Sequence, residues 1–238
     1  MRGGKYLYRS YGAGKRRAGR RGGSFSVAAA VAVVCVFSAI AVNALSPSDL
    51  LIYMPCRPCY AVCMGVFDNG EAAEKFALLL KERGGAGYVL SDGGRFLTLA
   101  AAYGSEADAV KVSDRLKEEG ENASVIDLSL KAENISFGGE ARLAKLCAGA
   151  ADMIYRAFLE LTVIADKIDA AAYDGGDLED IAARAEGIAG ALTGAAEPMA
   201  DKLRSLAEIC SGLSDECTSS DVRAASFDVF LSLKTDFR

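Results

Sequence analysis

Alternating apolar and polar residues flank a helix-like stretch, and this whole pattern occurs twice between residues 60 and 128, at a spacing of 36 residues. The matched positions are Phe67, Ala73, Phe76, Leu80-Lys81-Glu82 and Gly84 in the first copy, and Tyr103, Ala109, Val112, Leu116-Lys117-Glu118 and Gly120 in the second. Each copy is typical of a strand, a helix and a second strand. Because so short a unit cannot bury its helix alone, we expect both copies to share one βαββαβ sheet, an α+β ferredoxin-like arrangement.

Cap and turn residues give the expected boundaries of this module. The strands should cover residues 60–66, 88–90, 95 to about 102, and 123–128, with a hairpin turn at 91–94. The expected helix caps are Asp68 or Asn69 for the first helix, and Ser105 with Asp108 in a capping box for the second. In the first strand, Val62, Met64 and Val66 should share one face and Ala61, Cys63 and Gly65 the other. Both helices should cover one face of the sheet, which leaves the opposite face free for solvent or a ligand.

Helical periodicity dominates residues 140–238. Apolar residues at steps of three and four predict a first helix of roughly thirty residues between Leu143 and Ile168. Asp174-Gly175-Gly176 should end it, Pro198 suits the first turn of a third helix, and Ser219 or Ser220 can cap a fourth. We expect a small helical bundle that contacts a protein partner or another copy of the chain. Its acidic residues Glu160, Asp166, Asp169 and Asp177 are best explained as a solvated surface.

An uncharged run from Phe25 to Leu45 follows a basic segment, residues 1–24, for which we expect disorder. As a helix the run would be about 31 Å long, close to the thickness of a hydrocarbon core. The flanking charges then predict a single-pass transmembrane helix with its N-terminus in the cytoplasm and residues 46–238 outside. A cleaved signal peptide, with Val42-Asn43-Ala44 at the cleavage site, is the alternative. Residues 46–59 and 129–139 are expected to be linkers.

Charge and composition narrow the classes of function. The first 45 residues hold eight of the 27 Lys and Arg and none of the 32 Asp and Glu, so the rest of the chain has 19 basic against 32 acidic residues, a net charge of −13. Such an acidic body argues against nucleic-acid binding. With no His in the chain, serine-type triads and most zinc sites are excluded, and we expect no catalysis, cofactor or metal.

Cysteines raise one further hypothesis, which is thiol redox catalysis. Cys56 and Cys59 form a C-x-x-C pair, with Cys63 close behind. Thiol redox catalysis needs the first Cys at a helix N-terminus, whereas this pair leads into a strand. A zinc site would need a fourth ligand, and the next Cys is Cys147. The six cysteines outside the expected membrane helix allow 15 disulfide pairings, among which the sequence does not choose.

The stretch Tyr60–Phe67, the Ala six residues further on and the weaker echo that ends at Tyr103 resemble a SPOR domain. The resemblance covers residues 60–128, under a third of the chain. Proteins of this family are typically bitopic membrane proteins with the SPOR domain outside the cell membrane. The resemblance implies non-catalytic binding to peptidoglycan glycan strands that lack stem peptides, in cell division or sporulation.

The same resemblance supplies the candidate glycan-binding residues, which are Cys63, Val66, Arg95, Phe96, Leu97 and Thr98. The regular register places Arg95, Leu97 and Leu99 on the face without helices, whereas a one-residue bulge would instead expose Phe96 and Thr98 there. This chain has Cys63 where the family usually has Gln, Val66 where it often has a small polar residue, and Ala101-Ala102 where it usually has Gly-Pro. Because a thiol replaces an amide donor poorly, the alternative is a structural adaptor whose module has lost glycan binding and makes protein contacts.

Overall fold

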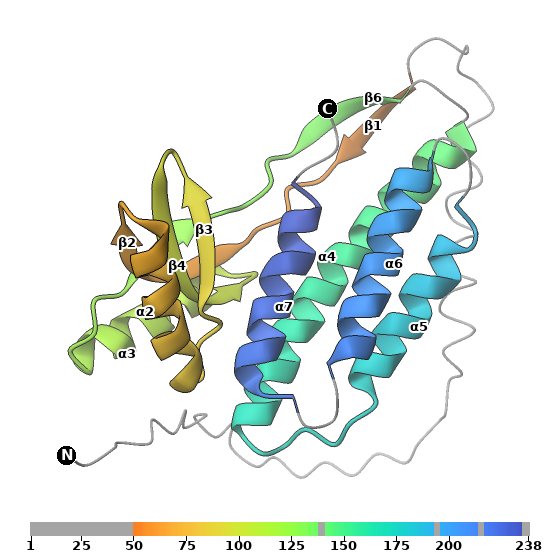
Figure 1. Ribbon diagram of the computed structural model, residues 1–238. Helices are drawn as coiled ribbons and strands as arrows, with labels where there is room; N and C mark the ends of the chain where they lie inside the picture. Colours follow the sequence, from red (N-terminus) through yellow and green to blue (C-terminus); the bar gives the residue numbers. More distant parts are fainter. Residues whose placement is uncertain (1–49, 138–140, 193–195, 214–216, 235–238) are drawn as a thin grey trace, which may run out of the picture.

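The structure is a computed structural model and describes residues 50–137, 141–192, 196–213 and 217–234. An α+β module, a helical bundle and a two-stranded ribbon lie side by side (Figure 1). Within the described residues, no helix is both long enough and apolar enough to cross a membrane. The run Phe25–Leu45 lies outside those residues.

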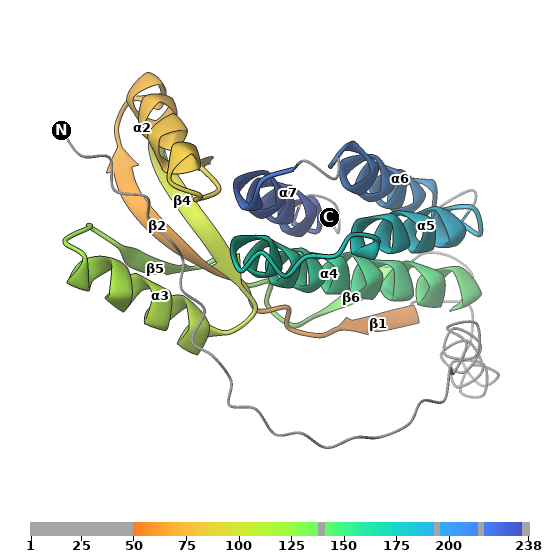
Figure 2. The ribbon, with the colours of Figure 1, turned by 90° about the horizontal axis from the view of Figure 1, so that it is seen from below.

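The module has the βαββαβ order that the repeat predicts. Its elements are β2 (Tyr60–Phe67), α2 (Gly70–Glu82), β3 (Tyr88–Asp92), β4 (Arg95–Tyr103), α3 (Glu106–Glu118) and β5 (Ser124–Asp127). The four strands form one antiparallel sheet in the order β3-β4-β2-β5. Each helix therefore connects two strands that are consecutive in the sequence but not adjacent in the sheet. Both helices pack on the same face of the sheet (Figure 2).

A compact core lies between this face and the two helices. It contains Val62 and Met64 of β2, Leu80 of α2, Ala109 of α3 and Ala100 of β4. These apolar side chains recur with strand or helix spacing, and their burial holds the two repeat halves together.

Most of the expected helix and turn signals occur where the sequence places them. The Asn69 side chain accepts a hydrogen bond from the backbone N–H of Glu71 at 2.9 Å and caps α2. Ser105 occupies the N-cap position of α3, but its side chain makes no capping hydrogen bond, so the predicted capping box is wrong. The β3–β4 turn is shorter than expected, because only Gly93 and Gly94 lie between the strands, both with positive φ.

Two segments that we expected to be linkers contain a β-ribbon. Strand β1 (Leu50–Met54) pairs antiparallel with β6 (Glu133–Phe137), and β1 packs on helix α4. Arg57, which is buried, pairs with Asp152 of α4 at 2.7 Å, and the Tyr155 hydroxyl donates to the carbonyl of Pro58 at 2.9 Å. The chain connection between module and bundle is therefore fixed to the bundle rather than free.

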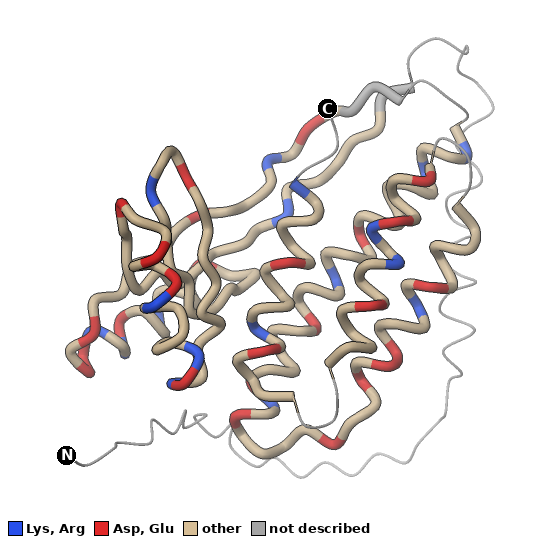
Figure 3. Tube along the Cα trace, viewed as in Figure 1, with Lys and Arg blue, Asp and Glu red and all other residues tan. Residues whose placement is uncertain are grey.

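Basic and acidic side chains are interspersed along the module and the bundle (Figure 3). The four acidic residues of the bundle noted above are not simply solvated. Glu160 pairs with Arg184, Asp177 with Lys167, and both Asp166 and Asp169 with Arg223.

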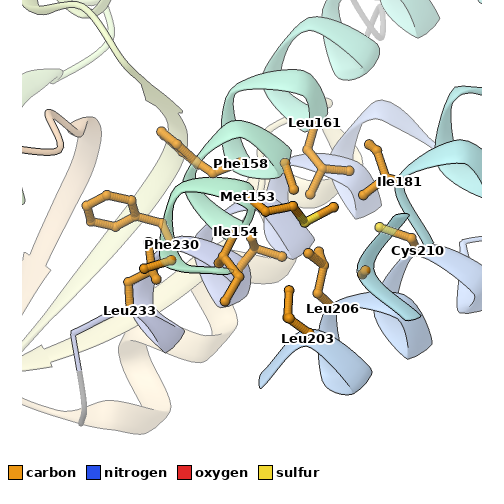
Figure 4. Packing of buried hydrophobic residues seen from close by; sticks show 14 of the residues in the cluster. Met153, Ile154, Phe158, Leu161, Ile181, Leu203, Leu206, Cys210, Phe230 and Leu233 are labelled. Carbon is orange, nitrogen blue, oxygen red and sulfur yellow. The ribbon is translucent and has the colours of Figure 1, made fainter. Parts of the chain in front are cut away.

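The bundle consists of helices α4 (Ala141–Asp169), α5 (Asp177–Ala189), α6 (Glu197–Gly212) and α7 (Ser219–Ser232). The break between α4 and α5 contains Gly175 and Gly176, both with positive φ, as predicted. Pro198 lies in the first turn of α6, also as predicted. Large side chains from all four helices fill the centre (Figure 4). The cap of α7 is Thr218, which forms a capping box with Asp221, so Ser219 and Ser220 lie inside the helix and not at its cap.

Candidate functional site

The register of β2 and β4 determines which side chains reach the face of the sheet opposite α2 and α3, hereafter the sheet face. The pairing of these strands shifts twice, once at Ala100 and once at Met64. Cys63 pairs with Leu99, and after the shift at Met64, Val66 pairs with Leu97. Directly paired residues point to the same face, so these four side chains share the sheet face.

Because of the shift at Met64, the expected grouping of Val62, Met64 and Val66 is wrong for Val66. Gly65 also changes side, since a Cβ at this position would lie 2.7 Å from the ring of Phe67, which packs at a tilt against Phe76 of α2. A single additional residue in a strand reverses the face of every residue beyond it.

One half of the sheet face is buried by the bundle, which corrects the expectation of a free face. This covered half contains Ala61, Cys63, Leu99 and Ala102, all at most 2% exposed and all in one cluster with Phe227 and Phe230 of α7. Helices α7 and α4 both contact β4 (Figure 2). The bundle therefore occupies the surface that the sequence left for a ligand.

The other half of the sheet face extends past α7 and stays accessible. This exposed half consists of Val66, Leu90, Leu97 and Arg95, which Cα pairing places side by side on β2, β3 and β4. Val66 is 52% exposed and Arg95 is exposed, whereas Leu90 and Leu97 are half-buried and pack against the edge of the covered half. A small apolar platform beside a guanidinium can contact the apolar side of a sugar ring and donate hydrogen bonds to its substituents.

The six candidate residues therefore divide into three groups. Val66, Leu97 and Arg95 lie together on the exposed half. The regular register of the third strand predicts this for Arg95 and Leu97, whereas Val66 reaches this face through the shift at Met64. Cys63 is on the same face but beneath the bundle. Phe96 and Thr98 lie on the helix side, where Phe96 packs near Gly70 of α2 and the buried Thr98 hydroxyl has no hydrogen-bond partner.

Thiol chemistry does not fit the two buried cysteines, Cys59 and Cys63, near the start of the module. Within the described residues, Cys56 is exposed, Cys59 and Cys63 are buried, and none of these three forms a disulfide. Burial, with a further contribution from the Asp127 carboxylate, raises the pKa of Cys59 to about 12. Burial also raises the pKa of Cys63, whose thiol donates to the carbonyl of Gly65. A redox or nucleophilic cysteine needs a lowered pKa, so Cys59 and Cys63 are packing groups.

Apart from the sheet face, a hollow with a volume of about 750 Å³ lies between α4 and α5. Its floor is apolar, with Leu159, Val163 and Ile164, and its charged rim consists of residues that already pair with one another. Among the described residues no cluster of His, Cys, Asp or Glu has a geometry that could hold a metal ion.

Contacts between α7 and the module were not predicted. Ser220 and Arg223 of α7 donate to the carbonyls of Gly85 and Gly84, in the turn that follows α2. The ring of Tyr88 stacks on Phe227 with centroids 5.0 Å apart. The one available sequence signal was that apolar and small residues of α7 occupy more than one stripe, which is typical of a helix buried on several sides.

Topology, register and core packing together define an α+β module with βαββαβ order, followed by a helical region. A search of solved structures finds the peptidoglycan-binding domain of the B. subtilis cell wall lytic enzyme CwlC, with 27% sequence identity and a TM-score of 0.27. The match covers 29% of this chain and 89% of that domain. No protein-family model matches the chain, and no curated protein matches it.

Proposed function

We propose that this chain is a non-catalytic, membrane-anchored protein that binds peptidoglycan glycan strands lacking stem peptides, in cell division or sporulation. The observation that carries the proposal is the exposed half of the sheet face, where Val66, Leu97 and Arg95 converge on a SPOR-type sheet. The solved domain of CwlC, to which the module is similar, is described as peptidoglycan-binding.

The chemistry of this surface suits a neutral polysaccharide. Leu90, Leu97 and Val66 offer an apolar platform, and the exposed Arg95 guanidinium offers up to five N–H donors to hydroxyl and acetamido oxygens. The excess of acid over base in the body of the chain disfavours strands that still carry anionic stem peptides.

Retention on purified cell-wall sacculi tests the proposal. We expect the full chain, in detergent, to sediment with sacculi from which an amidase has removed the stem peptides, and to sediment less with intact sacculi. Arg95→Ala and Val66→Asp should each weaken retention about 10-fold or more, because each removes or repels a direct ligand contact. Leu78→Asp is the matched control, since Leu78 is 63% exposed on α2 and its substitution should leave retention unchanged. Equal retention of all three variants would contradict the assignment of the exposed half.

The membrane topology has its own test. Cys56 is exposed and follows the proposed anchor, Phe25–Leu45, by a short segment. A membrane-impermeant maleimide applied to intact protoplasts should label the peptide that contains Cys56 if residues 46–238 lie outside, and this labelled peptide should be missing in the Cys56→Ser variant. Labelling of Cys56 only after lysis would place the body of the chain in the cytoplasm and remove the proposed access to the cell wall.

A second candidate function is a structural adaptor without glycan binding. The specific observation that favours it is the burial of Ala61, Cys63 and Leu99 under α7, since this half of the sheet face already has an intramolecular partner. The adaptor predicts no retention on sacculi of either kind, for the native chain and for every variant.

A further inference from the structure

Arg223 is a buried charge that no ligand-binding role explains. Its side chain is 5% exposed and lies between α7, α4 and the turn after α2. It donates to the Gly84 carbonyl at 2.7 Å, to Asp169 at 2.6 Å and to Asp166 at 3.1 Å. Removing the partners of a buried guanidinium is strongly unfavourable, so these contacts fasten the module to the bundle at this point.

Two further contacts extend this link along α7. The Ser220 hydroxyl donates to the Gly85 carbonyl at 2.6 Å, one residue from the Arg223 contact. One turn further along α7 from Arg223, Phe227 stacks on Tyr88, and burial together with the neighbouring Asp228 carboxylate raises the pKa of Tyr88 to about 12. All these contacts join α7 to the turn after α2 and to β3, at the edge of the covered half.

The covalent connection between the module and the bundle lies away from these α7 contacts. Arg57–Asp152 and the Tyr155–Pro58 hydrogen bond hold the ribbon end of the module to the middle of α4. The module is thus attached through the ribbon end, which is covalently continuous with the bundle, and through contacts of α7 and α4 with the sheet. Loss of the α7 contacts would leave the module tethered while the part of the covered half that α7 shields became accessible.

We propose that α7 is an autoinhibitory cover, held by a latch of Ser220, Arg223 and Phe227, and that release of this latch exposes Ala61, Cys63, Leu99 and Ala102 to the same glycan ligand. The inference rests on the proposed function for the identity of the ligand, although not for the existence of the latch. A ligand that contacts both halves of the sheet face binds the open form better, and it therefore shifts the population towards that form.

Two cysteines of the native chain report on the latch. Cys63 is 2% exposed in the covered half, whereas Cys210 is 1% exposed on α6, inside the bundle. Opening of the latch exposes Cys63 alone, whereas global unfolding exposes both. Maleimide labelling of the full chain, resolved by peptide mass spectrometry, distinguishes the two events.

In Arg223→Gln we expect Cys63 to react at least about 10-fold faster than in the native chain, with Cys210 unchanged. The matched control is Arg204→Gln, because Arg204 pairs with Glu197 and Asp201 on the exposed side of α6, and neither cysteine should respond. If Cys63 and Cys210 both become reactive in Arg223→Gln, that variant has lost its fold, and the milder Ser220→Ala decides. An unchanged Cys63 rate in Ser220→Ala, or in a folded Arg223→Gln, overturns the latch.

Retention on stem-peptide-free sacculi supplies the second readout. The latch predicts that Arg223→Gln is retained about 10-fold more strongly than the native chain, whereas Arg204→Gln is not. Equal retention of Arg223→Gln and the native chain shows that the covered half takes no part in binding and overturns the autoinhibitory role. No retention of any variant, with Cys63 still released, refutes the proposed function and leaves α7 as a cover for an adaptor surface.

Discussion

Single residues decide which chemistry reaches the sheet face. Met64 and Ala100 mark the two register shifts between β2 and β4, and the shift at Met64 moves Val66 to the side of Cys63 and Leu97. No propensity scale distinguishes a regular strand from a bulged one with the same residues, because the bulge is selected by packing on both faces. The same packing leaves Thr98 fully buried on the helix side.

Among the described residues the Thr98 hydroxyl has no hydrogen-bond partner, so we expect Thr98→Val to stabilise the chain by about 1 kcal/mol, since an unsatisfied buried hydroxyl is removed at constant shape. The measurement is the free energy of unfolding from urea titration. Thr162→Val is the matched control, because that hydroxyl donates to the Leu159 carbonyl at 2.7 Å, and it should bring no gain. Destabilisation by Thr98→Val would mean that the hydroxyl has a partner.

Alkaline pH should weaken the fold through Cys59. Burial raises the pKa of the folded Cys59 thiol from its ordinary value of 9.0 to about 12, so the folded state keeps a proton that the unfolded state loses. The contribution of this thiol is constant below pH 9, and the free energy of unfolding then falls between pH 9 and 12, by about 1.4 kcal/mol per pH unit. Subtracting the curve of Cys59→Ala isolates this slope from that of other groups. Parallel curves for the two proteins would contradict it.

At the scale of elements, helix and strand positions follow from local pattern, but their partners do not. The repeat and the glycines locate α2, α3 and the four strands of the module within a few residues. The β1–β6 ribbon was not predicted, because five-residue strands separated by 78 residues carry no local sign of pairing. The sequence predicted helix α7, but it did not predict the contact of this helix with the sheet.

The β3–β4 turn gives a test at this scale. Gly93 and Gly94 have φ of 56° and 85°, and a Cβ at either would meet no atom within 4 Å. Any cost of substitution is therefore due to the backbone, and Gly94→Ala should destabilise the chain by about 1 kcal/mol. Gly93→Asn, which creates the Asn-Gly pair preferred in such turns, should be neutral or slightly stabilising. Thermal unfolding followed by circular dichroism measures both, and equal effects of the two substitutions would contradict a turn with two left-handed residues.

For the whole molecule, the central observation is that one buried cluster runs from the sheet face through α7 into the bundle. Separate domains would each enclose a core of their own. Here the module has a small core under its helices and shares a larger one with the bundle. Its stability is therefore coupled to that of its neighbour.

This coupling predicts one cooperative unfolding transition for residues 50–234. Hydrogen exchange in increasing denaturant should show amides of β2 and β4 losing protection at the same midpoint as amides of α5 and α6. Phe227→Ala removes the stack on Tyr88 and should separate the two midpoints, with the module unfolding first. Two midpoints already present in the native chain would show that the shared cluster does not couple the two parts.

The sequence by itself determined the repeated βαββαβ order, the helical character of the C-terminal half and the absence of His-based chemistry, because these depend on residue type and local periodicity. The regular register of the third strand also placed Arg95 and Leu97 on one face, but the sequence did not choose between that register and a bulged one, and it grouped Val66 with Val62 and Met64. Only the tertiary structure decided that α7 covers half of that face and that Arg223 joins the two parts, since burial between distant segments arises from packing that no local pattern encodes.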